Sequence, residues 1–140
     1  MKHITRKLLT LAVLCCFAVF ALAGCGSDNK ESETIRIGAK SMTEQMILQE
    51  ILAQLIEAKT DLTVERIEPI AGGTSNIQIS MENGEMDLYP EYTGTGWLTV
   101  LKHEETQDAD YMFAELNKQY NEKYNMSWVG LYGFENTYTL

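Results

Sequence analysis

The sequence of 140 residues predicts an α/β fold with a mostly parallel sheet flanked by helices. Short segments in which apolar and polar residues alternate have the pattern of strands, and longer segments with apolar residues every three or four positions have the pattern of helices. The two kinds of segment alternate along the chain, which favours parallel strands joined by right-handed crossovers. Ligands of such sheets bind at the carboxyl ends of the strands, so the loops there are the first candidates for a site.

Two strands and one helix are expected at the start of the folded part. Residues 34–38 (TIRIG) and residues 62–70 (LTVERIEPI) alternate in polarity and predict the strands. Between them, Ser41 and Glu44 form a capping-box pattern at the start of a helix that runs to about Lys59. The apolar residues at helical spacing in this segment are Met46, Ile47, Leu48, Ile51, Leu52, Leu55 and Ile56. The helix is therefore expected to be amphipathic.

A second helix is expected over residues 74–83, and a short third strand over residues 86–89. A glycine after the helix supplies the usual stop signal. The turn before it, residues 71–74 (AGGT), has two interpretations. It is either a plain tight turn with Thr74 or Ser75 as the N-cap, or a turn that presents backbone N–H groups to an anion at the positive end of the helix.

The last part of the chain predicts two more helices and a strand. A turn-rich segment, residues 90–96, leads into a short helix over residues 97–101. A longer helical pattern follows, with apolar and aromatic residues at Tyr111, Met112, Phe113, Leu116 and Tyr120. Residues 126–131 have the pattern of a fourth strand.

The chain begins with the pattern of an export signal. Basic residues precede an apolar run over residues 8–22, and Leu22-Ala23-Gly24-Cys25 has the small residues of a cleavage site. This four-residue box resembles that of bacterial lipoprotein signals, which implies cleavage before Cys25 and attachment of diacylglycerol to its sulfur. A signal anchor retained in the membrane is the alternative, although the run is short for a span of about 20 residues.

Three parts of the chain follow from this interpretation. Residues 1–24 are expected to be a lipoprotein signal peptide. Residues 25–33 are expected to be a lipidated, flexible tether, because GSDNKESE has too few apolar residues to pack. Residues 34–140 are long enough to bury one modest core. The predicted location is the extracytoplasmic face of the cell membrane, through the lipid anchor.

Composition excludes several functions. Three of the 11 basic residues and none of the 20 acidic ones lie in residues 1–24, so the remainder carries a formal charge of −12, which disfavours nucleic acid as a partner. No cysteine follows Cys25, so the folded part has no disulfide or thiolate metal site. The two histidines, His3 and His103, support no catalytic dyad or metal cluster. We expect no enzyme activity, no metal and no cofactor.

Chemically distinctive residues collect in the loops that follow the four predicted strands. These are Lys40 and residues 71–74, 92–96 and 134–138. Taken singly, each has a plain interpretation: Lys40 as a solvated surface lysine, Glu91 as a solvated turn acid, and Tyr92 or Tyr138 as a packed tyrosine with a wet hydroxyl. Thr95 can cap the next helix. Five other tyrosines are interpreted as packing residues: Tyr89, Tyr111, Tyr120, Tyr124 and Tyr132.

Four segments, in this order, resemble the substrate-binding proteins of ABC transporters for glycine betaine, choline, carnitine and related osmoprotectants. They are IGAKSMTEQMILQEILAQLIE (37–57), GGT (72–74), NGEMDLYPEYTGTG (83–96) and GFENTYTL (133–140). YPEYTGT is the most specific of them. The resemblance implies a hinged protein of two α/β lobes, with the type II architecture of periplasmic binding proteins, that closes on a trimethylammonium compound.

The resemblance also implies roles for individual residues. Tyr92 and Tyr138 match two walls of an aromatic box, in which ring faces attract a cation that cannot donate hydrogen bonds. Lys40 matches a lysine that pairs with the carboxylate of a betaine, Thr95 a threonine that hydrogen-bonds it, and the main chain near Asn136 another part of the lining. A lysine rather than a glutamine at position 40 favours betaines over choline.

The implied partners are a small quaternary ammonium solute and the permease and ATPase subunits of a transporter. Because the relatives continue into a second lobe, the chain is expected to be an amino-terminal fragment whose first lobe is incomplete, and to bind betaine weakly or not at all by itself. Two alternatives stay open: the same scaffold with choline, carnitine or an amino acid as ligand, and a surface lipoprotein with a structural or adhesive role.

Overall fold

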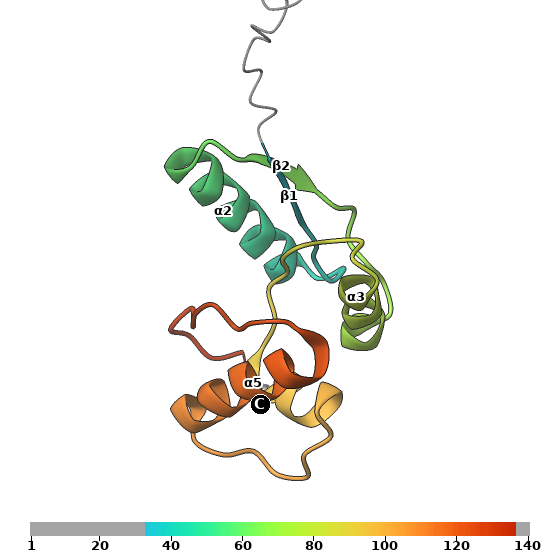
Figure 1. The fold of residues 1–140 in the computed structure, drawn as a ribbon, viewed down its shortest axis with the longest axis vertical. Coiled ribbons are helices and arrows are strands. Elements are labelled where there is room, and N and C mark those ends of the chain that lie inside the picture. The colour runs from blue at the N-terminus through green and yellow to red at the C-terminus, as the bar shows by residue number, and fades with distance from the viewer. Residues whose placement is uncertain (1–32, 137–140) are drawn as a thin grey trace, which may run out of the picture. The chain divides into compact units, whose positions relative to one another are not determined.

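The computed structural model describes residues 33–136, and its first elements form a β–α–β unit. Strand β1 (Thr34–Ile37) pairs in parallel with strand β2 (Thr63–Arg66), with Ile35 opposite Val64. Helix α2 (Thr43–Lys59) connects the two strands and runs alongside them (Figure 1). The structure thus confirms the predicted α/β fold with parallel strands and flanking helices.

The second and third strands are shorter than the sequence predicts. Beyond β2, pairing resumes only at a single parallel bridge between Lys40 and Ile70, and the third strand is reduced to a parallel bridge between Ile37 and Leu88. For the third strand, the side chain of Asp87 explains the loss of regular pairing. Its carboxylate accepts a hydrogen bond from the backbone N–H of Arg36 (2.8 Å), and the guanidinium of Arg36 binds both carboxylate oxygens. A carboxylate therefore replaces a strand carbonyl in the ladder.

Helix α2 is held to the strands by its buried face and by charged residues. The buried amide of Gln49 donates to the carbonyl oxygens of Ile37 (2.6 Å) and Ile67 (2.9 Å). On the exposed side, Arg66 of β2 pairs with Glu50 (2.7 Å) and Glu57 (2.9 Å). The amide of Gln49 thus joins the buried face of the helix to the strands, and Arg66 joins its exposed side to β2.

The predicted capping box at the start of α2 is wrong. The N-cap position is Met42, and no side chain caps the helix there. Glu44 does not fold back onto the start of the helix, because its carboxylate accepts hydrogen bonds from Tyr92 and Asn136. At the other end, the helix stops at Lys59 as predicted, and the hydroxyl of Thr60 donates to the carbonyl of Ile56.

Helix α3 (Gly73–Glu82) begins one residue earlier than predicted. Its N-cap is Gly72 rather than Thr74 or Ser75, and this glycine has a φ of 87°, which residues with a side chain rarely adopt. A Cβ atom on Gly72 would also meet the amide of Asn76, which binds the carbonyl of Ala71. The two glycines are therefore needed for the turn, and Thr74 is left free for other contacts.

Three helical segments follow: α4 (Thr93–Thr95), a π-helical turn η1 (Gly96–Val100) and α5 (Ala109–Tyr124). The carboxylate of Asp108 caps α5 by accepting hydrogen bonds from two backbone N–H groups. The short helix predicted over residues 97–101 and the longer helix after it are both confirmed.

The fourth strand, predicted over residues 126–131, is absent. Asn125 ends α5 in the left-handed conformation (φ 55°), and the chain then turns back along the helix. Trp128 packs against Tyr120 with the two rings perpendicular, and its backbone N–H donates to the side chain of Asn117. The alternating apolar residues of this segment pack against a helix instead of a sheet.

The buried residues form two hydrophobic clusters. The first joins the strands to α2 and contains Ile37, Ala53 and Val64. The second joins η1 to α5 and contains Trp97, Leu101, Met112, Leu116 and Tyr120. Over residues 33–136, no helix combines the length and the apolarity that crossing a membrane requires.

We expect replacement of Gln49 by Leu to lower the free energy of unfolding by about 2 kcal/mol, because the carbonyl of Ile67 loses its side-chain donor and that of Ile37 keeps only the backbone N–H of Ile67. Urea unfolding followed by circular dichroism measures the change. Gln54→Leu, on the exposed side of the same helix, is the matched control and should change the free energy by less than about 0.5 kcal/mol. Equal effects of the two substitutions would contradict this account of the amide.

The ion pair between Arg36 and Asp87 predicts a loss of stability in acid. The hydrogen bond from the Arg36 side chain lowers the pKa of Asp87 below its ordinary value of 3.8. The unfolded chain therefore takes up this proton first as the pH falls, so the stabilisation is complete above about pH 4 and is lost below it. Between pH 6 and pH 3 the free energy of unfolding should decline less for Asp87→Asn than for the wild type. The control variant Asp61→Asn should show the same decline as the wild type.

Candidate functional site

A buried ion pair lies at the end of β1. The ammonium of Lys40 is 2.5 Å from a carboxylate oxygen of Glu91, and each side chain is only 5% exposed. The same ammonium is 3.2 Å from the hydroxyl of Thr74, which donates to the second oxygen of Glu91 at 3.0 Å. The backbone N–H of Tyr92 also donates to Glu91. The three side chains thus satisfy one another away from solvent.

The topology explains why these distant residues meet. Lys40 follows β1 and bridges Ile70, which precedes the turn that carries Thr74. Glu91 follows Leu88, whose carbonyl accepts a hydrogen bond from the backbone N–H of Gly38. All three loops leave the carboxyl ends of parallel segments, so the predicted clustering of loops after the strands is confirmed for these three.

The plain interpretations of Lys40 and Glu91 are wrong. Neither is a solvated surface residue, because each charge is buried against the other. An isolated buried charge is too costly to persist, whereas a paired one with further hydrogen bonds is tolerated. The anion beside the start of α3 is therefore the protein's own Glu91, held through the hydroxyl of Thr74.

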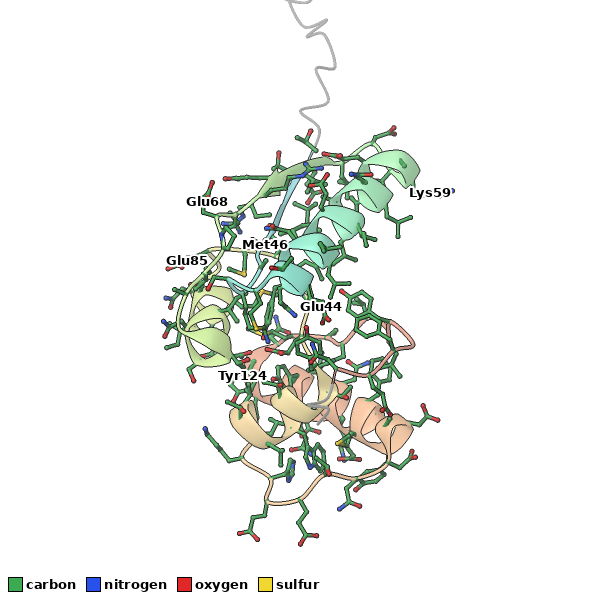
Figure 2. All side chains as sticks on the ribbon, turned by 180° about the vertical axis from the view of Figure 1, so that it is seen from behind. Glu44, Met46, Lys59, Glu68, Glu85 and Tyr124 are labelled. Carbon is green, nitrogen blue, oxygen red and sulfur yellow. The ribbon has the colours of Figure 1, made fainter. Side chains whose placement is uncertain are left out.

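Tyr92 lies over this pair and connects it to the start of α2. The ammonium of Lys40 is 4.9 Å from the centre of the Tyr92 ring, within the range of a cation–π contact. The hydroxyl of Tyr92 donates to Glu44, and the amide of Asn136 donates to the same carboxylate oxygen. Figure 2 shows Glu44 and Lys59 at opposite ends of α2. Glu44, Tyr92 and Asn136 thus form a second polar group next to the ion pair.

Burial first, and then the hydrogen bond to Glu44, raises the pKa of the Tyr92 hydroxyl, whereas the amides of Gln45 and Asn136 lower it. The hydrogen bonds from Tyr92 and Asn136 lower the pKa of Glu44. At neutral pH the site therefore holds a neutral tyrosine hydroxyl beside an ionised carboxylate.

The predicted site residues have different outcomes. Lys40, Tyr92 and Asn136 lie in one connected set of contacts. Thr95 is the last residue of α4 and is half-buried, and its side chain caps neither α4 nor η1. Tyr138 and the lipidation residue Cys25 lie outside the described residues.

Glu44 and Gln45 are site residues that the sequence did not reveal. Glu44 has the right spacing from Ser41 for a capping box, and that pattern concealed its long-range contacts. Gln45 is fully buried, although glutamine is usually a surface residue. No sequence signal distinguished either residue: the partners of Glu44 lie 48 and 92 positions away in the chain, and the amide of Gln45 has no hydrogen-bond partner among the described residues.

A hollow of about 460 Å³ lies near Glu91 and is lined mainly by aromatic and apolar residues. Its lining includes Tyr89, Tyr120, Trp128 and Tyr132. Tyr120 is a buried packing residue, as predicted. Tyr111 and Tyr132 are 54% and 43% exposed, although the ring of Tyr111 packs edge-on against Trp97 and that of Tyr132 lies against Phe134.

A family model for the substrate-binding domain of ABC-type glycine betaine transport systems (OpuAC) matches residues 33–140. The chain therefore belongs to this family of binding domains, which is not a family of enzymes. The resemblance noted in the sequence is confirmed. A crystal structure described as a glycine betaine/carnitine/choline ABC transporter superimposes with a TM-score of 0.62 at 26% identity, over 76% of this chain and 40% of the other.

Three curated relatives show the range of ligands in the family. The ergothioneine transport permease/ergothioneine binding protein EgtU of Helicobacter pylori is 44% identical over 79% of this chain. The carnitine transport binding protein OpuCC of Listeria monocytogenes is 38% identical over 84% of it, and the glycine-betaine-binding protein of Pseudomonas aeruginosa is 33% identical over 96%. The matches cover 19%, 38% and 40% of these relatives, so the chain spans at most about two fifths of their length.

The buried ion pair predicts a large effect of Glu91→Gln. Glutamine has one oxygen, so it can accept from only one of the two donors, Thr74 and the backbone N–H of Tyr92, and it leaves the ammonium of Lys40 buried without a counter-charge. The expected loss is about 3–5 kcal/mol in the free energy of unfolding. The double variant Lys40→Met, Glu91→Gln should recover most of this loss. Urea unfolding of both variants measures these changes. A free energy of unfolding for Glu91→Gln within about 1 kcal/mol of the wild type would contradict the prediction.

Proposed function

We propose that the chain is part of the extracytoplasmic substrate-binding component of an ABC importer for a quaternary ammonium solute, with glycine betaine or a related osmolyte as ligand. Membership of the family over residues 33–140 supports the class. The observation that carries the proposal is the convergence of Lys40, Thr74, Glu91 and Tyr92 at the carboxyl ends of parallel segments. Binding sites of α/β proteins form at this edge.

The ring of Tyr92 suits a methylated cation. A quaternary ammonium group has no N–H, so hydrogen bonds cannot hold it, and aromatic faces attract it through their quadrupole. The Lys40 ammonium lies 4.9 Å from the centre of this ring, which supports the assignment of Tyr92 to a cation site. We propose Tyr92 and Tyr138 as two walls of an aromatic box, with Lys40, Thr95 and the chain at Asn136 near the polar end of the solute.

The proposed partners follow from the family. A permease and an ATPase would receive the solute, and the lipid on Cys25 would keep the protein at the extracytoplasmic face of the membrane. The three relatives include binding proteins for ergothioneine, carnitine and glycine betaine. All three solutes carry a trimethylammonium group, which makes this group the shared feature of the proposed ligand.

Saturation-transfer NMR on the methyl signal of millimolar glycine betaine, choline or carnitine tests the proposal, since it detects weak binding. For this test the chain is joined to the second lobe that the resemblance implies. We expect Tyr92→Leu to weaken binding about 2- to 30-fold, the equivalent of one cation–π contact of about 0.5–2 kcal/mol. Tyr92→Phe retains the ring and should stay within about threefold of the wild type.

Tyr111→Leu, an exposed tyrosine of α5, serves as the control and should not change binding. The proposal fails if no methylated amine gives a saturable signal, or if Tyr92→Leu binds like the wild type. The second result would favour the alternative of a structural or adhesive lipoprotein, for which this ring has no role.

A further inference from the structure

Glu44 has an acceptor to spare at the candidate site. One carboxylate oxygen, Oε1, accepts the hydrogen bonds from both Tyr92 and Asn136. The other, Oε2, accepts no hydrogen bond from the described residues, and the side chain is exposed. An ionised carboxylate can only accept hydrogen bonds, and its bonds to donors are stronger than those between neutral groups.

Gln45, the next residue, adds a second and independent observation. Its side chain is 0% exposed, and neither its amide nitrogen nor its amide oxygen has a partner in the described part of the chain. Leaving such groups unpaired costs free energy, so a buried, unpaired amide calls for a functional explanation. No hydrogen bond of ordinary length and angle joins this amide to Tyr92, but the amide lowers the pKa of the Tyr92 hydroxyl, which is the effect of an N–H donor.

The charged groups of the site are not equally available to a solute. Lys40, whose ammonium would pair with a solute carboxylate, is already bound to Glu91 and Thr74 in a buried position. Glu44 keeps an exposed oxygen that accepts no hydrogen bond from a described residue, and the amide oxygen of Gln45, the next residue in the chain, is also unpaired in that part of the chain. The described part of the site therefore has unpaired hydrogen-bond acceptors, whereas its lysine is already paired within the protein.

We propose that Glu44 contacts the solute and selects quaternary ammonium compounds that carry a hydrogen-bond donor, such as a hydroxyl or ring N–H, over those that carry none. Gln45 acts as a positioning residue: its amide N–H group faces the Tyr92 oxygen and keeps the hydroxyl directed at Oε1 of Glu44, so that Oε2 stays available to the solute's donor. The inference rests on the proposed function and narrows its ligand class. Glycine betaine has no donor, whereas carnitine has a hydroxyl.

A matched pair of solutes isolates the donor. Carnitine and 4-(trimethylammonio)butanoate share the methylated cation and the carboxylate and differ only in the hydroxyl. Titration of the two-lobed protein with each solute, followed by NMR, gives the ratio of their dissociation constants. We expect carnitine to bind about tenfold more tightly, the effect of one hydrogen bond to a charged acceptor.

Substitutions assign this preference to the two residues. Glu44→Gln keeps an oxygen for Tyr92 and Asn136 but replaces the free acceptor by an N–H donor, so the ratio should fall to about twofold or less. Gln45→Met fills the same space without polar atoms and should also reduce the ratio. In a Tyr92→Phe background, Gln45→Met should have no further effect, because the hydroxyl that it positions is gone. Glu50→Gln, on the same helix but paired with Arg66, should leave the ratio unchanged.

Each outcome has a separate meaning. If both solutes bind equally to the wild type, or if Glu44→Gln keeps the tenfold ratio, the inference is wrong and the proposed function stands. If neither solute binds, both the inference and the proposed function are contradicted. Should Gln45→Met fail to fold, which circular dichroism would show, the wild-type ratio and the Glu44→Gln variant still decide.

Discussion

The candidate site depends on one interaction, the buried ion pair between Lys40 and Glu91. Two opposite charges in a place with almost no solvent hold each other in position, because separating them would leave both uncompensated. The pair draws in the hydroxyl of Thr74 and the backbone of Tyr92. Three loops from separate parts of the chain are thereby fixed at one edge, and the ring of Tyr92 is placed over a cation.

The local backbone prepares this arrangement. Positive φ angles at Gly72 and Gly73 start α3 early, so that Thr74 lies within the first turn and its hydroxyl reaches the ion pair. Arg36 and Asp87 hold the segment before Glu91 against β1 where regular strand pairing is missing. The site thus depends on irregular backbone, as expected for residues carried on loops by a more regular scaffold.

The sequence predicted the parts of the fold in which local pattern and tertiary packing agree. The extent of helix α2, the end of α3 at a glycine, and the meeting of Lys40 with the loops after Ile70 and Leu88 belong to this group. The predicted apolar face of α2 does not, because Met46, Ile47, Ile51 and Leu55 are exposed, while Gln45 and Gln49 are buried. The fourth strand was not predictable, because the alternating residues around Trp128 pack on α5, a contact that no local pattern encodes. The same limit concealed Glu44, whose local pattern indicated a cap while its partners came from distant loops.

The ion pairs of this protein differ in how much water reaches them. Arg66 and its two glutamates are on the surface, where dissolved ions gather around each charge and weaken the attraction. Lys40 and Glu91 are closed off from those ions, so their attraction is far less sensitive to ionic strength. The geometry around Tyr92 is therefore expected to stay nearly constant from dilute to concentrated salt. The attraction between Arg66 and the glutamates of α2, by contrast, weakens as the salt concentration rises.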